Sequence, residues 1–190
     1  MDDIVLAALA KWPKVPHCYG WLGLSERGQW FMRDAGAQAA GDFDSGAPGS
    51  KGSWLKHDKL IAFIQRNYAH DDQGQWFFQN GPQRVYVELQ STPYVWRVGA
   101  DLQVRAHTEQ FASPRQCFTD EQGHVYLETD LGLGLVHTQD VIFAAQAIES
   151  GAWSLAPVKR AELAQRFGFV RSPQRVQQEK GLVPPAPSPA

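Results

Sequence analysis

Residues 76–90 read WFFQNGPQRVYVELQ and contain the clearest structural signal in the chain. Val85, Val87 and Leu89 alternate with polar or aromatic residues, which is the two-residue period of a strand with one buried face. The turn residues Asn80-Gly81-Pro82 precede this alternation and follow an aromatic segment. A β-hairpin is therefore predicted, with strands at Trp76–Gln79 and Arg84–Gln90.

Short segments of similar character continue after this hairpin, and helical patterns lie on both sides of it. Leu60, Ile61, Phe63 and Ile64 are spaced for one face of a helix that extends to Tyr68. The further strands expected are Tyr94–Val98, Leu102–His107, Gln116–Phe118, His124–Glu128 and Leu133–His137, arranged as an antiparallel meander. The further helices expected are Ile4–Ala10, Asp140–Ser150 with Thr138 as its N-cap, and Pro157–Phe167.

A short pattern occurs three times along the chain. In each copy an acidic residue, any residue and glycine precede two bulky residues, and the glycines are Gly28, Gly74 and Gly123. Glycine adopts positive φ at little cost, so each copy is typical of a hairpin turn. The acidic residues Glu26, Asp72 and Glu121 are expected to accept hydrogen bonds from nearby backbone amides. The pattern predicts an internal structural repeat and does not define an active site.

The fold class predicted from these elements is α+β, with antiparallel hairpin and meander sheets in repeated units packed against helices in a single compact body. The body is expected to cover residues 1–156, with sub-units at 1–55, 56–110 and 111–156. A basic helical extension is expected at 157–180 and a disordered, proline-rich tail at 181–190. The Gly-, Ala- and Ser-rich stretch Ala35–Gly52 is expected to be loose.

Composition excludes several classes of protein. The 190 residues are 43% hydrophobic, with 18 basic and 20 acidic side chains, so neither a disordered chain nor a general DNA-binding protein is indicated. No apolar run approaches the roughly 20 residues of a membrane helix, so no membrane insertion is expected. Met1-Asp2-Asp3 is unlike the basic start of a signal peptide, which favours a cytoplasmic protein. Cys18 and Cys117 are too isolated to suggest a disulfide framework or a zinc site.

Two blocks of the sequence resemble a proteobacterial family known only as a domain of unknown function. The first is Trp12-Pro13 with Pro16-His17-Cys18-Tyr19-Gly20-Trp21, and the second runs from Asn67-Tyr68 through 74–87 to Thr92-Pro93-Tyr94. The resemblance covers about residues 1–150. The order of helix, turn, aromatic residues and two strands is also similar to a second uncharacterised bacterial family, which has repeated α+β motifs and a proposed signal-transduction role. Neither resemblance implies catalytic residues.

No residue set in the sequence predicts catalysis, a metal site or a cofactor. His70-Asp71-Asp72, and His137 with Asp140, have ligand-like side chains, but turn and helix-capping roles explain them more simply. Cys18 adjoins His17, yet neighbouring side chains in a strand point to opposite faces. A small hydrolase with a His- and Asp-lined, metal-assisted pocket is therefore the alternative function rather than the first.

The segment around the hairpin turn has more hydrogen-bonding groups than a turn requires. The guanidinium of Arg84 is suited to a carboxylate or a phosphate. The sequence favours an ordinary cross-strand ion pair for Arg84, and a ligand contact is the alternative. The candidate ligand-binding residues are Asn80, Gln83, Arg84, Tyr86 and Trp96.

Charge is unevenly distributed, because the chain beyond Pro157 is basic and the remainder is acidic. This end of the chain is expected to fold back on the acidic body, although contact with RNA or a membrane surface is a third functional hypothesis. The leading hypothesis is a non-catalytic binding or regulatory module for a small anionic ligand or a protein partner, and a homodimer is left open. The basic residues are Lys159, Arg160, Arg166, Arg171, Arg175 and Lys180, against the acidic Glu162 and Glu179.

Overall fold

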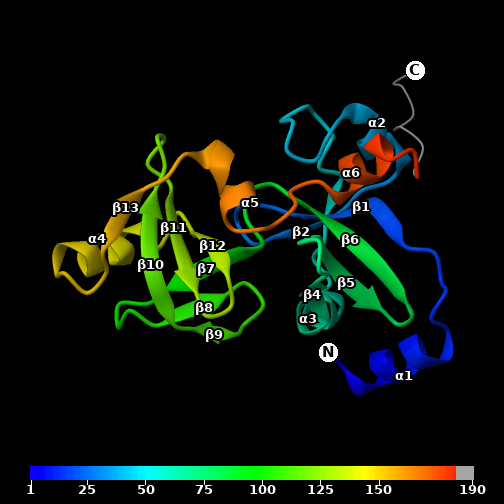
Figure 1. The fold of residues 1–190 in the computed structure, drawn as a ribbon, viewed down its shortest axis with the longest axis horizontal. Coiled ribbons are helices and arrows are strands. Elements are labelled where there is room, and N and C mark those ends of the chain that lie inside the picture. Colours follow the sequence, from blue (N-terminus) through cyan, green and yellow to red (C-terminus); the bar gives the residue numbers. More distant parts are fainter. Residues whose placement is uncertain (183–190) are drawn as a thin grey trace. The chain divides into compact units, whose positions relative to one another are not determined.

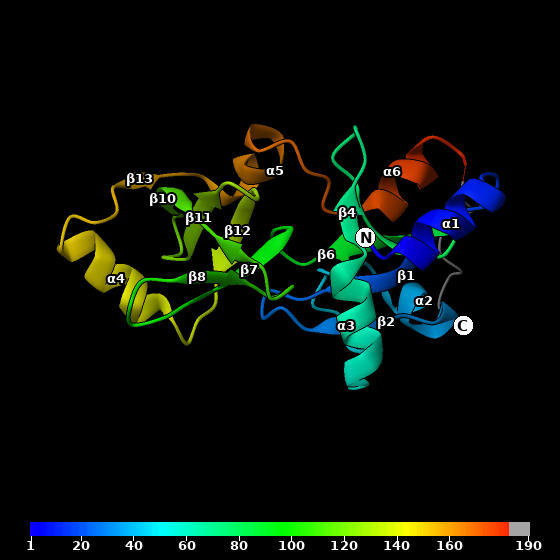
Figure 2. The same cartoon turned by 90° about the horizontal axis from the view of Figure 1, so that it is seen from below.

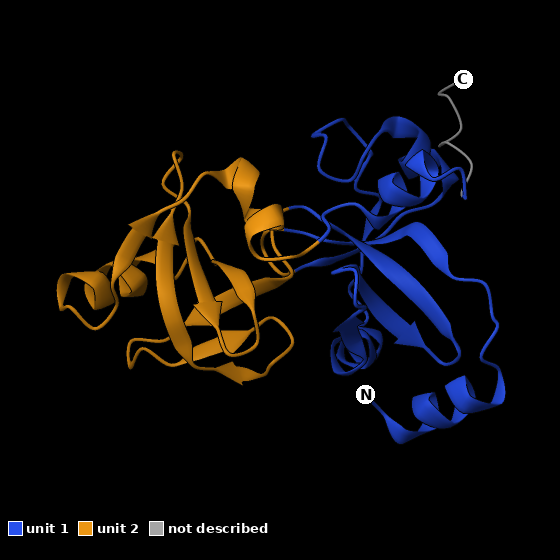
Figure 3. Ribbon diagram, in the orientation of Figure 1, with its two compact units in different colours: residues 1–25, 29–90, 170–190 blue, residues 26–28, 91–169 orange. Residues whose placement is uncertain are grey.

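The computed structural model describes residues 1–182, and the tail predicted at 181–190 lies outside the described residues from position 183 onward. The chain contains two compact units (Figure 3). Unit 1 consists of Met1–Ser25, Gln29–Gln90 and the chain from Val170 onward. Unit 2 consists of Glu26–Gly28 and Ser91–Phe169. The sub-unit boundaries expected from the sequence at residues 55, 110 and 156 stay predictions.

Unit 1 is built on a six-stranded sheet (Figure 1). Its strands are β1 (Cys18–Leu24), β2 (Trp30–Met32), β3 (Ser53–Trp54), β4 (Tyr68–His70), β5 (Trp76–Asn80) and β6 (Gln83–Leu89). They lie in the order β3-β2-β1-β6-β5-β4. The predicted hairpin is confirmed as β5–β6, with Phe78 opposite Val85. The central pair β1–β6 is parallel, which the expected antiparallel arrangement did not include.

Helices pack on both faces of this sheet. The helices of unit 1 are α1 (Asp3–Lys11), α2 (Ala35–Ala40), α3 (Asp58–Arg66) and α6 (Pro173–Glu179). Helix α3 contacts β5, where the ring of Phe63 meets Phe78 edge to face. The chain runs from α3 directly into β4 (Figure 2). Helix α3 ends before Tyr68, because Asn67 caps it and Tyr68 already belongs to β4. Helix α6 contacts β1 and β6 on the opposite face, where Glu88 accepts a hydrogen bond from the Gln174 amide.

The stretch 35–52 is not loose, contrary to the prediction from its composition. Arg33 is buried and donates hydrogen bonds to the carbonyl groups of Gly41 and Ser50. These bonds hold the segment in place, and the ring of Phe43, a residue of the same segment, is buried. A single buried arginine thus satisfies backbone groups that would otherwise need water.

Unit 2 is built on a seven-stranded sheet. Its strands are β7 (Tyr94–Val98), β8 (Val104–Ala106), β9 (Phe111–Ala112), β10 (Pro114–Thr119), β11 (Val125–Thr129), β12 (Leu133–Val136) and β13 (Leu155–Pro157). They lie in the order β13-β10-β11-β12-β7-β8-β9. The expected antiparallel pairing is confirmed for β7–β8 and for β10–β11–β12. The two groups do not form one continuous meander, because β12 pairs with β7 in parallel, and β13 pairs with β10 in parallel. Both sheets are therefore mixed, and the predicted α+β class is confirmed.

The helices of unit 2 are shorter than the sequence suggested. They are α4 (Val141–Glu149), the 3-10 helix η1 (Arg160–Glu162) and α5 (Leu163–Arg166). The N-cap of α4 is Asp140 rather than Thr138. Pro157 ends β13 instead of opening a helix, and Gly168 ends the helical segment with φ of 66°. No helix within residues 1–182 combines the length and the apolar character that crossing a membrane requires.

The three repeated glycines have the predicted backbone conformation. Gly28 and Gly74 have φ of 74° and Gly123 has φ of 81°. The residue that accepts the backbone hydrogen bonds is not the predicted acid but its neighbour on the N-terminal side. Asp71 accepts from the amides of residues 73 and 75, and Asp120 accepts from those of residues 122 and 124. The internal repeat itself stays a prediction.

Candidate functional site

Arg84 lies near the start of β6 and is held over an aromatic ring of the neighbouring strand. Its guanidinium carbon is 4.3 Å from the centre of the Phe77 ring, and Gln79 lies directly opposite Arg84 in the strand pair. A cation over a ring face is attracted by the ring's electrons. Arg84 has no acidic side chain within ion-pair distance among residues 1–182, so the cross-strand ion pair favoured by the sequence does not form there.

Aromatic rings surround Tyr86 on the same side of the sheet. The rings of Tyr19 and Tyr86 are stacked, with centroids 4.6 Å apart and planes 5° apart. His17 and Phe77 each meet the Tyr86 ring at a steep angle. Tyr86 shares this side with Arg84 because the two residues are separated by one position in a strand. We call this group the Arg84 face; its residues are His17, Tyr19, Asp71, Phe77, Arg84 and Tyr86.

Asp71 is the acidic member of the Arg84 face, and its hydrogen-bonding capacity is already used. One carboxylate oxygen accepts from the amides of Gln73 and Gln75, at 3.0 and 2.9 Å. The other accepts from the Tyr86 hydroxyl at 3.1 Å and from the Gln75 side chain at 3.2 Å. Asp71 therefore orders the β4–β5 turn and orients Tyr86, and Arg84 carries the cationic charge of this face.

Burial shifts the pKa values of three groups of the Arg84 face, His17, Tyr19 and Tyr86, toward their neutral forms. Partial burial lowers the pKa of His17, and the charge of Arg84 acts in the same direction. Burial, with Tyr86 beside it, raises the pKa of Tyr19 to about 12. Burial also raises the pKa of Tyr86. The two hydroxyl groups consequently keep their protons.

Two buried amide oxygens near this face, one just before β5 and one on it, have no hydrogen-bond partner among residues 1–182. They are the Oε1 atoms of Gln75 and Gln79. The Gln79 side chain donates to the Gly81 carbonyl, and the Gln75 side chain donates to Asp71. A buried acceptor without a donor is costly, and an ordered water usually fills the role. Neither residue is among the candidate ligand-binding residues that the sequence indicated.

The other predicted site residues do not join the Arg84 face. Asn80 lies opposite Gln83 and lines an apolar cavity of about 350 Å³ with Cys18 and Val85. Gln83 donates to the Pro16 carbonyl, which holds the incoming chain beside β6. Trp96 belongs to the core of unit 2, is fully buried, and donates to the Leu127 carbonyl. The period-two rule already separates Gln83 from Arg84, because consecutive strand residues face opposite ways.

The groups considered for metal binding or catalysis have structural partners. Asp140 pairs with Arg97, and Asp71 caps its turn. Burial raises the pKa of Cys18, which does not favour a thiolate. Across residues 1–182, no three His, Cys, Asp or Glu side chains converge so that they could hold a metal ion.

Three of the basic residues near the C-terminus pair with acidic residues elsewhere in their own unit, in the direction that the charge distribution predicted. In unit 1, Arg171 pairs with Asp44 at 2.8 Å, and Arg175 pairs with Asp42. In unit 2, Arg160 lies 4.0 Å from Glu26. Much of the basic character of this segment is thereby offset within the fold.

Two mixed sheets with helices packed on them define this protein as an α+β protein. The chain belongs to the DUF2944 family, described as "Protein of unknown function (DUF2946)", which matches residues 1–174. The match extends beyond the 150 residues expected from the sequence and includes much of the C-terminal segment. No curated protein matches the chain.

Two solved structures are similar to parts of this chain. A DUF1285 family protein from Silicibacter pomeroyi DSS-3 is 11% identical with a TM-score of 0.47, and the match covers 77% of this chain and 84% of that protein. A DUF1285 family protein from Shewanella baltica OS155 is 14% identical with a TM-score of 0.44, covering 66% of this chain and 91% of that protein.

Proposed function

We propose that this protein is a non-catalytic binding module of the cytoplasm that takes a small anionic ligand at the Arg84 face. One observation carries the proposal. Arg84 is half-buried and held in place, yet no carboxylate among residues 1–182 lies within ion-pair distance of it. A guanidinium that is held in place without an acidic partner can offer its planar fork of donors to an anion from outside the described chain.

The surroundings of Arg84 reduce the entropy that its side chain would lose on binding an anion. Packing on Phe77 restricts the guanidinium before the ligand arrives, so less rotational freedom remains to be lost. A charge-assisted hydrogen bond from arginine contributes about 1.5–3 kcal/mol. Tyr19 adds a protonated hydroxyl to the same face. These features suit a planar or tetrahedral anion such as a carboxylate or a phosphate.

The proposal is tested with inorganic phosphate and citrate as probes, titrated into the ¹⁵N-labelled protein. The variants are R84A, R84K and the control R115A, which removes an exposed arginine of unit 2. We expect at least one probe to shift amides of β5 and β6, with affinity about tenfold weaker in R84A. R115A should match the wild type, and R84K should be intermediate because lysine lacks the planar fork.

Equal affinity of R84A and the wild type would remove the proposal, as would failure of both probes to shift β5 and β6. Thermal unfolding serves as the control for folding. R84A should melt close to the wild type, since its guanidinium makes no ion pair within residues 1–182. A large loss of stability in R84A would show that Arg84 has a structural role instead.

A further inference from the structure

A row of side chains crosses three neighbouring strands of unit 2. Arg97 of β7 lies directly opposite Arg105 of β8, and Arg105 lies opposite Phe111 of β9. Like charges directly opposite each other destabilise a sheet, so both arginines need compensating partners. The row lines a cleft of about 370 Å³. We call it the arginine cleft; its lining includes Arg97, Asp101, Gln103, Arg105, Phe111 and Asp140.

The two arginines are compensated to different degrees. Asp140 accepts from Nε and Nη2 of Arg97 and also from the Val98 amide. Although burial alone would raise it, these bonds hold the pKa of Asp140 below its usual value. Arg105 instead pairs with Glu109 at 2.8 Å, and the two side chains are 48% and 65% exposed. Such an exposed pair is weak, so a ligand carboxylate can replace Glu109.

Asp101 places a carboxylate at another part of the same cleft. One of its oxygens accepts from the Gln103 amide at 3.1 Å. No basic side chain among residues 1–182 lies within ion-pair distance of Asp101. The cleft thus combines an arginine whose partner is easily displaced with a carboxylate that has no cationic partner in the described chain.

The turns that carry these groups are held in an unusual backbone conformation. Leu102 and Glu109 have φ of 62° and 67°, and they are the non-glycine residues of positive φ in the described part of the chain. Leu102 follows Asp101, and Glu109 is the partner of Arg105. Backbone strain of this kind persists where the surrounding structure requires it, and it often marks ligand-binding positions.

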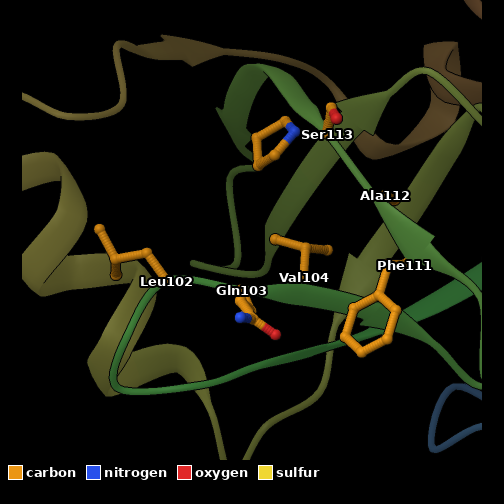
Figure 4. A pocket seen from close by; sticks show the side chains of 7 residues that line it. Leu102, Gln103, Val104, Phe111, Ala112 and Ser113 are labelled. Atoms are coloured by element: carbon orange, nitrogen blue, oxygen red, sulfur yellow. The ribbon is translucent and has the colours of Figure 1, made fainter.

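An apolar surface adjoins the charged groups. Phe111 is 68% exposed and lies in β9, the edge strand of the sheet. Phe111 and Gln103 also line a neighbouring hollow of about 580 Å³, together with Leu102 and Val104 (Figure 4). A ligand held in the arginine cleft would therefore have apolar surface beside it.

We propose that the arginine cleft binds a small zwitterion of the α-amino acid class. The ligand carboxylate lies against Arg105 in place of Glu109, its ammonium group lies against Asp101, and an apolar side chain packs on Phe111. This site is formed entirely by unit 2 and is independent of the Arg84 face of unit 1. The charges of the cleft favour a zwitterion over a simple anion, because only the zwitterion has an ammonium group to pair with Asp101.

Three related probes test this proposal by NMR titration of the full-length protein. L-Phenylalanine carries both charges, 3-phenylpropionate lacks the ammonium group, and phenethylamine lacks the carboxylate. We expect L-phenylalanine to shift amides of β7, β8 and β9 and to bind at least about tenfold more tightly than either other probe. Equal binding of 3-phenylpropionate, or no binding of L-phenylalanine, would overturn the zwitterion site.

Variants identify the groups that act. D101N removes a charge but keeps an oxygen for the Gln103 amide, so the turn should be preserved. It should weaken L-phenylalanine roughly tenfold and leave 3-phenylpropionate no weaker, and R105Q should weaken both. R115A serves as the matched arginine control, and R84A should leave L-phenylalanine binding unchanged. An unaltered affinity in D101N would contradict the proposed role of Asp101.

Discussion

Replacing Glu88 with glutamine should remove a large pH dependence from the stability of the protein. Glu88 is buried beneath α6, where its Oε1 accepts from the Gln174 amide at 3.0 Å. Burial raises the pKa of Glu88 from an ordinary value of 4.5 to about 7. A carboxyl whose pKa is raised on folding binds its proton more tightly in the folded state. Its stabilising contribution is therefore complete below pH 4.5 and is lost as the pH rises through about 7.

The magnitude follows from the two pKa values. The gap of about 2.5 pH units corresponds to about 3 kcal/mol at full extent, and to roughly 2.5 kcal/mol between pH 5 and pH 8. Urea unfolding of the wild type, E88Q and E179Q at these two pH values measures the difference. E179Q makes the same chemical change at an exposed position of α6.

Comparison with E88Q separates Glu88 from the other titrating groups. From pH 5 to pH 8 the wild type should lose about 2.5 kcal/mol of unfolding free energy relative to E88Q. E179Q should follow the wild type. Parallel pH profiles of the wild type and E88Q would refute the reasoning, because they would show that the buried carboxyl does not change its proton affinity on folding.

Three further predictions concern unit 2 and are measured by urea unfolding. Burial lowers the pKa of His107 from 6.5 to about 3. The stabilising contribution of His107 to unfolding free energy is therefore present above pH 6.5 and is lost as the pH falls through about 3. The variant H107Q should lack this loss of stability in acid, and equal pH profiles of H107Q and the wild type would contradict the prediction. G123A should lower the unfolding free energy by about 1 kcal/mol through backbone strain alone, because Gly123 has φ of 81° and a new Cβ would meet no neighbouring atom. G36A, in the helix α2, should show no such backbone strain. Y126F should cost about 1.5–3 kcal/mol, because the buried hydroxyl donates to Asp120 at 2.8 Å; a neutral effect would show that the hydrogen bond is not stabilising.

The hairpin at residues 76–90 was predictable because its evidence is local. Alternation of Val85 and Val87 fixes the strand, and the Gly-Pro turn fixes the reversal. The parallel pairing of β1 with β6 and of β7 with β12 joins segments far apart in the sequence. Neither alternation nor turn residues encode such partners, which is why the expected antiparallel arrangement lacked these parallel pairs.

The candidate site shows the same division between local and distant information. The shared side of Arg84 and Tyr86 follows from their spacing in one strand. The stacking of Tyr19 on Tyr86 depends on the β1–β6 pairing and was not predicted. The ring of Phe77 beneath Arg84 depends on the register of β5 with β6. Sequence alone therefore indicated the cation but not the surface that holds it.

The most direct test of the account is the ¹H–¹⁵N resonance of the Arg84 Nε–H group during titration with phosphate or citrate. The resonance is assigned by comparison with R84K, in which it is absent. The proposed function predicts that this signal shifts and saturates with the same apparent affinity as the amides of β5 and β6. If those amides saturate while the Arg84 signal stays unchanged, or if neither anion moves any of them, Arg84 is not the anion contact and the proposed function is wrong.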